Sequence, residues 1–309
     1  MQKFLMFFIS GAKVIIIFIF AGNQSRDSMN PKTPHSIPDL TSQIRRDIIR
    51  MVAAAKSGHP GGSLGSTDFL TVLFAEFLDQ DPAQWRRDGQ NADMFFLSIG
   101  HLSPLYYSLL ARMGYFPVKE LASFRKLGSR LQGHPSIENG LPGVHVASGS
   151  LGQGLSMACG AALSKRLAGD PHHVYVLMGD GESEEGQVWE AAIFAAHHKI
   201  TNLTAITDWN GQQIDGPVDE IGGVGDLNAK WTAFGWRVLE CDGHNPDDIR
   251  NAYRKAAEPG EKPVMILMHT NMGQGVDFMT GSHKWHGKAP SAEQEALALA
   301  QLKETLGDF

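Results

Sequence analysis

The sequence predicts an α/β fold, in which a doubly wound, mainly parallel sheet carries helices on both faces. Five candidate strands alternate with helical stretches along the chain, at residues 93–98, 174–178, 203–207, 236–240 and 264–269. Polar and glycine-rich motifs directly follow some of these segments, and open α/β sheets place their ligands at the carboxyl ends of strands. With 309 residues, 42% of them hydrophobic, the chain is large enough to bury the core of one such domain.

The composition argues against several classes of protein. The net charge of −6 is small and dispersed, without the cluster of basic residues that nucleic-acid binding requires. The only two cysteines, Cys159 and Cys241, indicate neither a disulfide framework nor a thiolate metal site, and they suit a reducing compartment. We therefore expect a cytoplasmic protein that does not bind nucleic acid.

Residues 1–28 form an apolar extension in front of the predicted domain, which covers residues 29–309. The segment 4–21 is almost wholly apolar, but it is marginal in length for a membrane span and contains Lys13. A signal peptide would need a small-residue cleavage site, which is not clear here. Three interpretations stay open: a true start of translation at Met29, which we favour, a membrane anchor, or an export signal.

The segment that begins near residue 38 has the pattern of an amphipathic helix. Its apolar stripe is expected to face the core and its three arginines to turn away from it; the stripe is Ile44, Ile48, Val52 and Ala55, and the arginines are Arg45, Arg46 and Arg50. The glycines and proline at 58–62 predict the end of this helix and a tight loop that presents His59. Residues 291–306 repeat the amphipathic pattern and predict a closing helix.

A Gly-Asp-Gly motif at 179–181 and an asparagine, Asn210, follow two neighbouring predicted strands. Parallel strands end at the same edge of a sheet, so Asp180 and Asn210 are expected to lie close together. Magnesium prefers hard oxygen ligands and usually takes one or two carboxylates together with phosphate oxygens. Asp180, the Asn210 amide oxygen and the Gln212 carbonyl therefore predict a magnesium and diphosphate site. An ordinary turn is the alternative interpretation of Gly-Asp-Gly alone.

A glycine-rich turn, Ser-Gly-Ser-Leu-Gly-Gln-Gly at 148–154, runs directly into a predicted helix of small residues at 155–163. Such a turn is expected to offer free backbone amides and the positive end of the helix dipole to a diphosphate. A flexible loop ahead of a tightly packed helix is the alternative. Gly152 and Gly154 also imitate part of a dinucleotide fingerprint, but no convincing strand precedes them.

Five of the thirteen histidines stand in distinctive, mostly glycine-flanked loops: His59, His101, His134, His283 and His286. Histidines in such loops can reach a shared cleft, donate hydrogen bonds to hydroxyls and phosphates, and move protons near neutral pH. Surface or turn-capping positions are the alternative for each of them. Zinc ligation by His283 and His286 is a further alternative, although a three-residue spacing in a loop lacks the support that zinc sites use.

The ordered set of motifs resembles the transketolases. It comprises Ser-Gly-His-Pro-Gly-Gly-Ser-Leu-Gly at 57–65, Gly-His at 100–101, Gly-His-Pro at 133–135, Gly-Ser-Leu-Gly-Gln-Gly at 149–154, Gly-Asp-Gly at 179–181 with Glu185, the 210–216 segment, and Trp-His-Gly at 285–287. The resemblance covers about residues 40 to 290 and only the diphosphate-binding half of that family. It implies the thiamine diphosphate-binding fold and an enzyme that transfers a two-carbon ketol unit from a ketose, or ketose phosphate, to an aldose.

The resemblance also implies a role for each matching residue. Magnesium, or calcium in its place, would be held by Asp180, Asn210 and Gln212. Thiamine diphosphate would be bound by His101, Gly149, Leu151, Gly179, Asp180, Gly181, Asn210, Ile214 and His286. The catalytic residues would be His59, His101, His134 and His286, together with Glu185 in a carboxylate network across a subunit interface. Without the resemblance, Glu185 is interpreted as a first-turn glutamate favoured by the helix dipole.

The other half of a transketolase, which binds the pyrimidine ring, has no counterpart in this sequence. The resemblance therefore implies that the partner is a C-terminal transketolase subunit, in a heterotetramer with two copies of each chain that acts on a sugar or sugar phosphate. Two other functions stay open: a component of another thiamine diphosphate enzyme, such as a synthase that condenses an oxo acid with an aldehyde, and a noncatalytic interaction protein. Ile99 and His145 depart from the family pattern and are expected to tune the sugar pocket.

Overall fold

The computed structural model describes residues 3–10, 13–20 and 33–309, and the chain divides into two compact units, 1–30 and 31–309. In the first unit, β1 (Lys3–Ser10) pairs antiparallel with β2 (Lys13–Phe20). The start of translation predicted at Met29 lies outside the described residues. Within the described residues, none of the helices combines the length and the apolar character that a membrane span requires.

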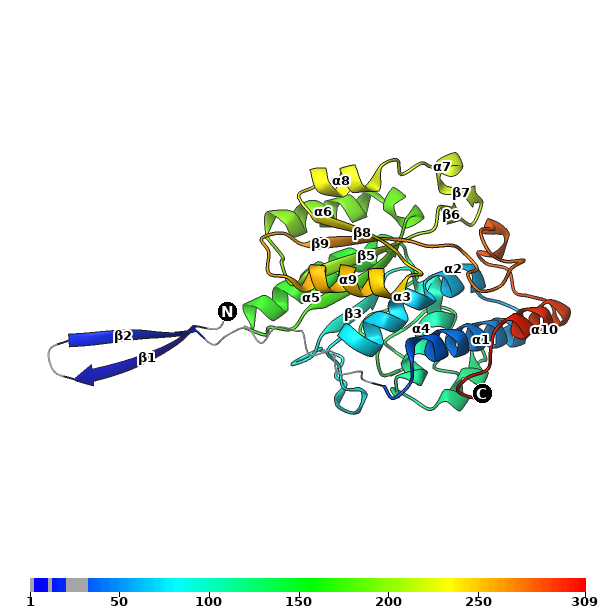
Figure 1. The fold of residues 1–309 in the computed structure, drawn as a ribbon, viewed down its shortest axis with the longest axis horizontal. Helices are drawn as coiled ribbons and strands as arrows, with labels where there is room; N and C mark the ends of the chain where they lie inside the picture. The colour runs from blue at the N-terminus through cyan, green and yellow to red at the C-terminus, as the bar shows by residue number, and fades with distance from the viewer. Residues whose placement is uncertain (1–2, 11–12, 21–32) are drawn as a thin grey trace. The chain divides into compact units, whose positions relative to one another are not determined.

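A five-stranded sheet forms the centre of the second unit (Figure 1). All neighbouring strands in it are parallel. Their spatial order is β3 (Met94–Leu97), β4 (Val174–Gly179), β5 (Leu203–Trp209), β9 (Val264–His269) and β8 (Arg237–Asp242). These are the five segments that the sequence predicts. The apolar runs of the inner strands made the prediction possible, because central strands of a parallel sheet are buried on both faces, whereas β8 lies at the edge and is only partly buried.

Helices cover both faces of the sheet, so the predicted doubly wound α/β class is confirmed. Side chains of β4 alternate between two hydrophobic clusters, with Tyr175 and Leu177 in one and Val174, Val176 and Met178 in the other. The first cluster includes α1 (Ile37–Ala55), α3 (Thr67–Val72), α4 (Ser103–Arg112) and α9 (Pro246–Ala257). The second includes α5 (Gln153–Leu167), α6 (Gly186–His197) and α8 (Leu227–Ala233).

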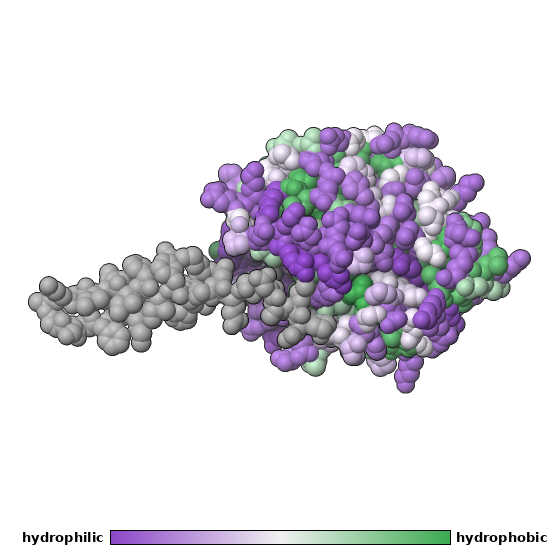
Figure 2. Space-filling view, viewed as in Figure 1, coloured by the Kyte–Doolittle hydropathy of each residue, from purple (hydrophilic) through white to green (hydrophobic). Residues whose placement is uncertain are grey.

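Short elements connect this framework and form its edges. They are α2 (Pro60–Gly65), η1 (Leu73–Phe77), η2 (Pro82–Gln84), η3 (Gly100–Leu102), η4 (Val118–Ser123), η5 (Gly181–Glu184), β6 (Gln212–Gln213), β7 (Gly216–Pro217), α7 (Val218–Ile221), η6 (His283–Trp285) and α10 (Ala292–Gln301). His59 stands at the N-terminus of α2 and not in an open loop, because Pro60 starts a new helical turn there. The face seen in Figure 2 is largely hydrophilic, with hydrophobic residues in small separate groups.

The predicted apolar stripe of α1 is buried at Ile44, Ile48 and Val52, but the prediction for its arginines is wrong. Arg45 forms an ion pair of 2.7 Å with Asp68, and Arg46 forms one of 2.6 Å with Asp308. Arg50 donates a hydrogen bond of 2.6 Å to the carbonyl oxygen of Phe309. The arginines are drawn inward because further segments of the chain pack beside this helix, which its own periodicity does not reveal.

The predicted closing helix is also shorter than expected. Ser291 and Gln294 form a capping box at the start of α10, but Leu302 adopts an extended conformation and ends the helix. The last residues run along α1, where Gln43 Oε1 accepts hydrogen bonds of 3.0 Å from the backbone nitrogens of Thr305 and Leu306. These contacts with α1 replace the helical hydrogen bonds that the amphipathic pattern alone predicts.

Candidate functional site

The two motifs that were expected to form a metal site meet at the carboxyl ends of β4 and β5. Parallel pairing places Gly179 opposite Asp208. The buried Asp180 accepts a hydrogen bond of 2.7 Å from the Gly181 nitrogen at Oδ1 and one of 2.5 Å from the Gly211 nitrogen at Oδ2. Asp180 is therefore tied to the turn that begins at Asn210.

Asp208 is a second buried carboxylate at this edge, and the sequence analysis missed it. It accepts hydrogen bonds from Ser66 Oγ at 3.0 Å, from Asn210 Nδ2 at 2.9 Å and from Thr270 Oγ1. Asn210 Oδ1 in turn accepts a bond of 2.9 Å from the Gln212 nitrogen, which fixes the turn. The sequence signal that could have identified Asp208 is its place near the end of the buried strand β5. The structure then pairs it with Gly179.

The electrostatics of this edge fit a divalent cation. Burial raises the pKa of Asp180 to about 7, with the nearby Asp208 carboxylate as a further cause, and burial also raises the pKa of Asp208. Neither carboxylate forms an ion pair with a basic residue among residues 33–309. A bound cation would relieve the cost of two buried negative charges.

The available donors are hard oxygens of the kind that magnesium and calcium prefer: the Asp180 carboxylate, the Asn210 amide oxygen and the Gln212 carbonyl. No group of three or more histidine, cysteine, aspartate or glutamate side chains is placed to hold a metal within the described residues. The zinc alternative at His283 and His286 thus has no support in this part of the chain. The residues present fit magnesium or calcium with oxygens from a bound diphosphate.

The glycine-rich turn differs from its prediction. Two of its amides are not free, because the Gly152 nitrogen donates to Glu182 Oε1 at 2.7 Å and the Gly154 nitrogen donates to Ser98 Oγ at 3.0 Å. Glu182 is buried, and its Oε2 accepts a bond of 3.1 Å from the Gly179 nitrogen. A protein carboxylate therefore occupies the N-terminus of α5 and ties it to the end of β4.

Four of the five distinctive histidines come together from four separate segments of the chain. The ring centroid of His59 lies 5.1 Å from that of His101, 6.3 Å from that of His134 and 5.6 Å from that of His286, and those of His101 and His286 are 5.0 Å apart. We call these four residues the histidine cluster. Among residues 33–309, His283 makes no ring contact with it.

The histidine cluster consists of neutral rings at pH 7. Burial lowers the pKa of His59 to about 4, and the charges of His286, Arg125 and His134 act in the same direction. Burial likewise lowers the pKa of His101, His134 and His286. The Nδ1 atoms of His59 and His286 are buried without a hydrogen-bond partner in the described part of the chain. Neutral imidazoles of this kind can donate to, or accept a proton from, a sugar hydroxyl.

One end of the glycine-rich turn is linked through Glu182 to the end of β4, and the other end lies against the histidine cluster. A methyl group on Gly149, whose φ is +144°, would lie 3.4 Å from the ring of His134. At the other end of the turn, one on Gly152, whose φ is +81°, would lie 2.9 Å from Glu185 Cβ. Gly149 thus lies against His134, and Gly152 lies against Glu185.

The other predicted residues differ in exposure. Leu151 is half-buried, whereas Glu185, at the start of α6, is exposed and Ile214 is 62% exposed. Ile99 is buried beside Gly179, where an added methyl group would lie 3.3 Å from Ile99 Cγ2. Exposed positions are compatible with a subunit interface, and the roles of these residues stay predictions.

His145 does not join the histidine cluster, and its expected role in tuning the sugar pocket stays a prediction. Its ring stacks on Phe96 at 6.0 Å, lies 5.4 Å from the ring of Trp85, and has Nδ1 3.0 Å from the Arg87 carbonyl oxygen. His145 therefore packs against Phe96 of β3 and against Trp85.

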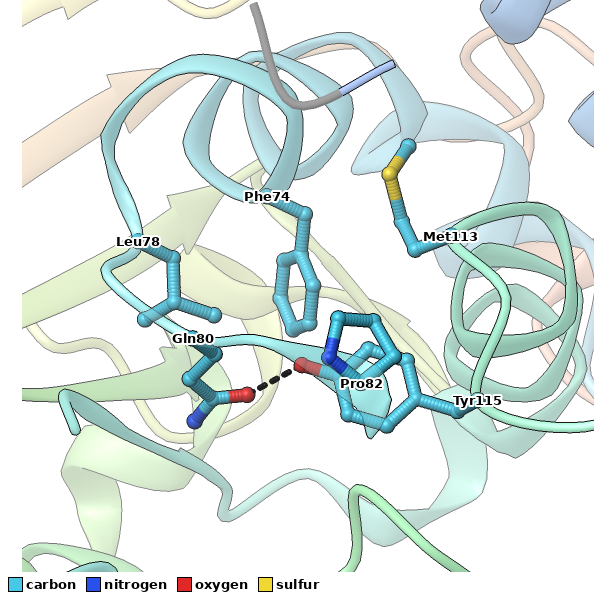
Figure 3. A pocket seen from close by; sticks show the side chains of 6 residues that line it. All are labelled: Phe74, Leu78, Gln80, Pro82, Met113 and Tyr115. Carbon is cyan, nitrogen blue, oxygen red and sulfur yellow. Dashed lines mark hydrogen bonds between the residues drawn. The ribbon is translucent and has the colours of Figure 1, made fainter. Parts of the chain in front are cut away.

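A small cavity lies between the end of η1 and the end of α4 (Figure 3). Its volume is about 20 Å³, which is enough for one water molecule. Tyr115 donates a hydrogen bond to Gln80 across it, and none of its lining residues belongs to the predicted site. A sugar cannot bind there.

Comparisons with known proteins identify the class and then the family. The family model described as "Transketolase, thiamine diphosphate binding domain" matches residues 38–308, so this is a thiamine diphosphate-binding domain. The chain belongs to the transketolase family.

Two relatives have about the same length as this chain. One is a subunit of the apulose-4-phosphate transketolase of Phocaeicola vulgatus, which is 36% identical over 265 residues, 85% of this chain and 92% of the relative. The other is the 6-deoxy-6-sulfo-D-fructose transketolase subunit SqwG of a Clostridium species, which is 38% identical over 263 residues, 84% of this chain and 94% of the relative. These findings confirm the prediction of an enzyme subunit, the N-terminal component of a two-component transketolase.

Solved transketolases share the fold. The structure from Leishmania mexicana superposes with a TM-score of 0.83 and 32% sequence identity, over 89% of this chain and 42% of that chain. The structure from Campylobacter jejuni gives a TM-score of 0.79 and 33% identity, over 86% of this chain and 42% of that chain. This chain therefore spans less than half the length of these solved transketolases.

Proposed function

We propose that this chain and a C-terminal transketolase subunit, which carries the pyrimidine-binding domain, together transfer a two-carbon ketol unit from a ketose, or ketose phosphate, to an aldose. One observation carries the proposal. The turn at residues 148–152 contacts the histidine cluster at one end, and at the other it is linked through Glu182 to the end of β4, beside the proposed metal ligands. One end of that arrangement suits a diphosphate with its cation. The other suits the hydroxyls of a sugar.

Thiamine diphosphate, when bound, supplies the carbanion chemistry of the reaction. In this chain, Asp180, Asn210 and Gln212 hold magnesium, or calcium in its place, and so anchor the diphosphate. His59 and His286 offer buried Nδ1 atoms, unpaired among the described residues, that can form hydrogen bonds with hydroxyls of the sugar. Their lowered pKa keeps these rings neutral at pH 7, so that each ring can both donate and accept a hydrogen bond.

The assembly that we propose contains two copies of each subunit. The exposed Glu185 and Ile214 would lie at the interfaces with neighbouring subunits, where a carboxylate network and an apolar contact with the cofactor would bury them. The two buried free cysteines suit a cytoplasmic location, which would also supply the cofactor. The names of the relatives support a sugar that bears an anionic group, as apulose 4-phosphate and 6-deoxy-6-sulfo-D-fructose do.

The test is reconstitution with a C-terminal transketolase subunit that carries the pyrimidine-binding domain. The wild-type pair is expected to transfer ketol units only with thiamine diphosphate and a divalent cation. Asp180→Ala is expected to abolish both cofactor retention and turnover, whereas Asp219→Ala, an exposed aspartate on α7, leaves both unchanged. Unchanged retention in Asp180→Ala would contradict the proposed site.

Two outcomes would favour the other functions. Condensation of pyruvate with an aldehyde, without turnover of any ketose donor, would assign the chain to another type of thiamine diphosphate enzyme. Failure of the complete complex to bind the cofactor would assign it a noncatalytic role.

A further inference from the structure

Arg125 has an unusual backbone conformation. Its φ is 59°, in the left-handed region that residues with a side chain rarely adopt. The hydrogen bond of 2.8 Å from its nitrogen to the Leu131 carbonyl oxygen holds this conformation. Strain of this kind concentrates at functional sites, where the surrounding structure fixes the direction of one side chain.

The guanidinium of Arg125 has few partners within the protein. Nη1 donates a hydrogen bond of 3.0 Å to Ser57 Oγ, while Nε is buried without a hydrogen-bond partner in the part of the chain that the structure describes. Among residues 33–309, no carboxylate forms an ion pair with Arg125, although Arg86 and Arg130 are each paired with one. A partly buried cation without a protein anion is a candidate for binding an external anion.

This guanidinium lies at the histidine cluster. A methyl group on Gly133, the residue before His134, would lie 2.7 Å from Arg125 Cζ, and Ser57 is two residues before His59. The positive charge of Arg125 is one cause of the lowered pKa of both His59 and His134. Because the imidazoles are neutral at pH 7, Arg125 supplies the positive charge at this end of the site.

We propose that Arg125 binds the anionic tail, a phosphate or a sulfonate, of the sugar substrate. The inference deepens the proposed function and rests on it. The planar guanidinium presents donors in a fixed fork that matches the oxygens of a tetrahedral oxyanion. The site also places part of the anion recognition on this subunit, beside the histidines that face the sugar hydroxyls.

A purely structural role for Arg125 makes a different prediction. Its guanidinium also lies 5.6 Å from the ring centroid of Phe124, so it contributes to the packing of its own turn. If that were its only role, a substitution would affect folding without any selectivity between charged and uncharged sugars. The experiment therefore compares ligands that differ only in the anionic group.

The first measurement uses the full chain without its partner. The ring signals of His59 and His134 are followed by NMR during titration with inorganic phosphate and, in a second arm, with methanesulfonate. Both signals are expected to shift in the wild type, and Arg125→Gln is expected to weaken the apparent affinity at least tenfold. Lys126→Gln, the same change of charge at the exposed neighbouring residue, serves as the matched control and is expected to bind as the wild type does. The anion that binds with the higher affinity identifies the kind of anionic tail that the site prefers.

The second measurement uses the reconstituted enzyme with three donors, D-fructose 6-phosphate, 6-deoxy-6-sulfo-D-fructose and D-fructose. Arg125→Gln is expected to raise KM at least tenfold for the donor with the preferred anion and less than twofold for D-fructose, with kcat retained within threefold. Arg125→Lys keeps the charge but not the forked arrangement of donors. Its KM for the donor with the preferred anion is expected to lie between those of the wild type and of Arg125→Gln.

Equal changes of KM for charged and uncharged donors, or unchanged binding of both anions by Arg125→Gln, would overturn the inference. A reconstituted pair without ketol transfer would instead refute the proposed function. The NMR titration of the chain alone separates these two failures, because it requires no turnover. Thermal unfolding of each variant shows whether a loss of binding reflects a loss of folded protein.

Discussion

Glu182 stabilises the candidate site by accepting three hydrogen bonds, from the nitrogens of Gly152 and Gly179 and from Ser98 Oγ. Replacing it with leucine leaves two buried backbone N–H groups without an acceptor, at about 1 to 3 kcal/mol each. The Ser98 hydroxyl can rotate to another acceptor, so we count only the amides. The free energy of unfolding is therefore expected to fall by about 4 kcal/mol. Glu182→Gln keeps one oxygen acceptor and is expected to lose about 2 kcal/mol.

The assay is urea unfolding at pH 7, followed by circular dichroism. With a denaturant slope of about 3 kcal/mol per molar, Glu182→Leu is expected to lower the midpoint by about 1.3 M. Glu184→Gln, an exposed glutamate two residues further along the chain, is the matched control and is expected to stay within about 0.5 kcal/mol of the wild type. A Glu182→Leu chain within about 1 kcal/mol of the wild type would refute the reasoning.

Three further predictions concern folding of the same unit. Because the folded-state pKa of His59, about 4, is below its ordinary value of 6.5, the unfolded chain binds more protons between these values. The contribution of His59 to the free energy of unfolding is therefore expected to fall by about 1 to 2 kcal/mol from pH 7 to pH 5. His59→Gln is expected to remove this pH dependence, measured by urea unfolding at both pH values. Gly154→Ala places a methyl group 2.3 Å from Ser98 Cβ and is expected to cost about 3 kcal/mol. Adding Ser98→Gly should recover part of that loss in a double-mutant cycle, and additive losses would contradict the contact. Arg112→Met leaves the fully buried Asp47 without its ion pair of 2.8 Å and is expected to cost about 3 to 5 kcal/mol in urea unfolding, where a loss below 1 kcal/mol would contradict this estimate.

The buried strands and the motifs at their ends could be predicted from the sequence because their signals are local. Most strands of the parallel sheet are short apolar runs, and the fold class follows from the way the strands alternate with helices. Asp180 and Asn210 follow two such strands, so the geometry of a parallel sheet is enough to predict that they meet at one edge.

Ion-pair and hydrogen-bond partners that are distant in the sequence could be identified only from the tertiary structure. The periodicity of α1 located its buried stripe but not the packing that draws Arg46 inward to Asp308. The amides of the glycine-rich turn looked free because nothing local to the turn reveals Glu182, which comes 30 residues after Gly152. A polar side chain can pair with any complementary group that the fold brings near, so its partner is not encoded in its neighbours.

The candidate site combines both kinds of information. The motifs alone singled out the residues that we predict to carry the chemistry, because several histidines and Asp180 stand in distinctive glycine-rich segments. The distances come from the tertiary structure, which brings the rings of His101, His134 and His286 within 6.3 Å of the ring of His59 and lowers the pKa of each ring. It also places Arg125 beside them, without a carboxylate partner among residues 33–309. The physical reason is that burial and charge depend on everything packed around a group, whereas a motif records only the residues adjacent to it in the chain.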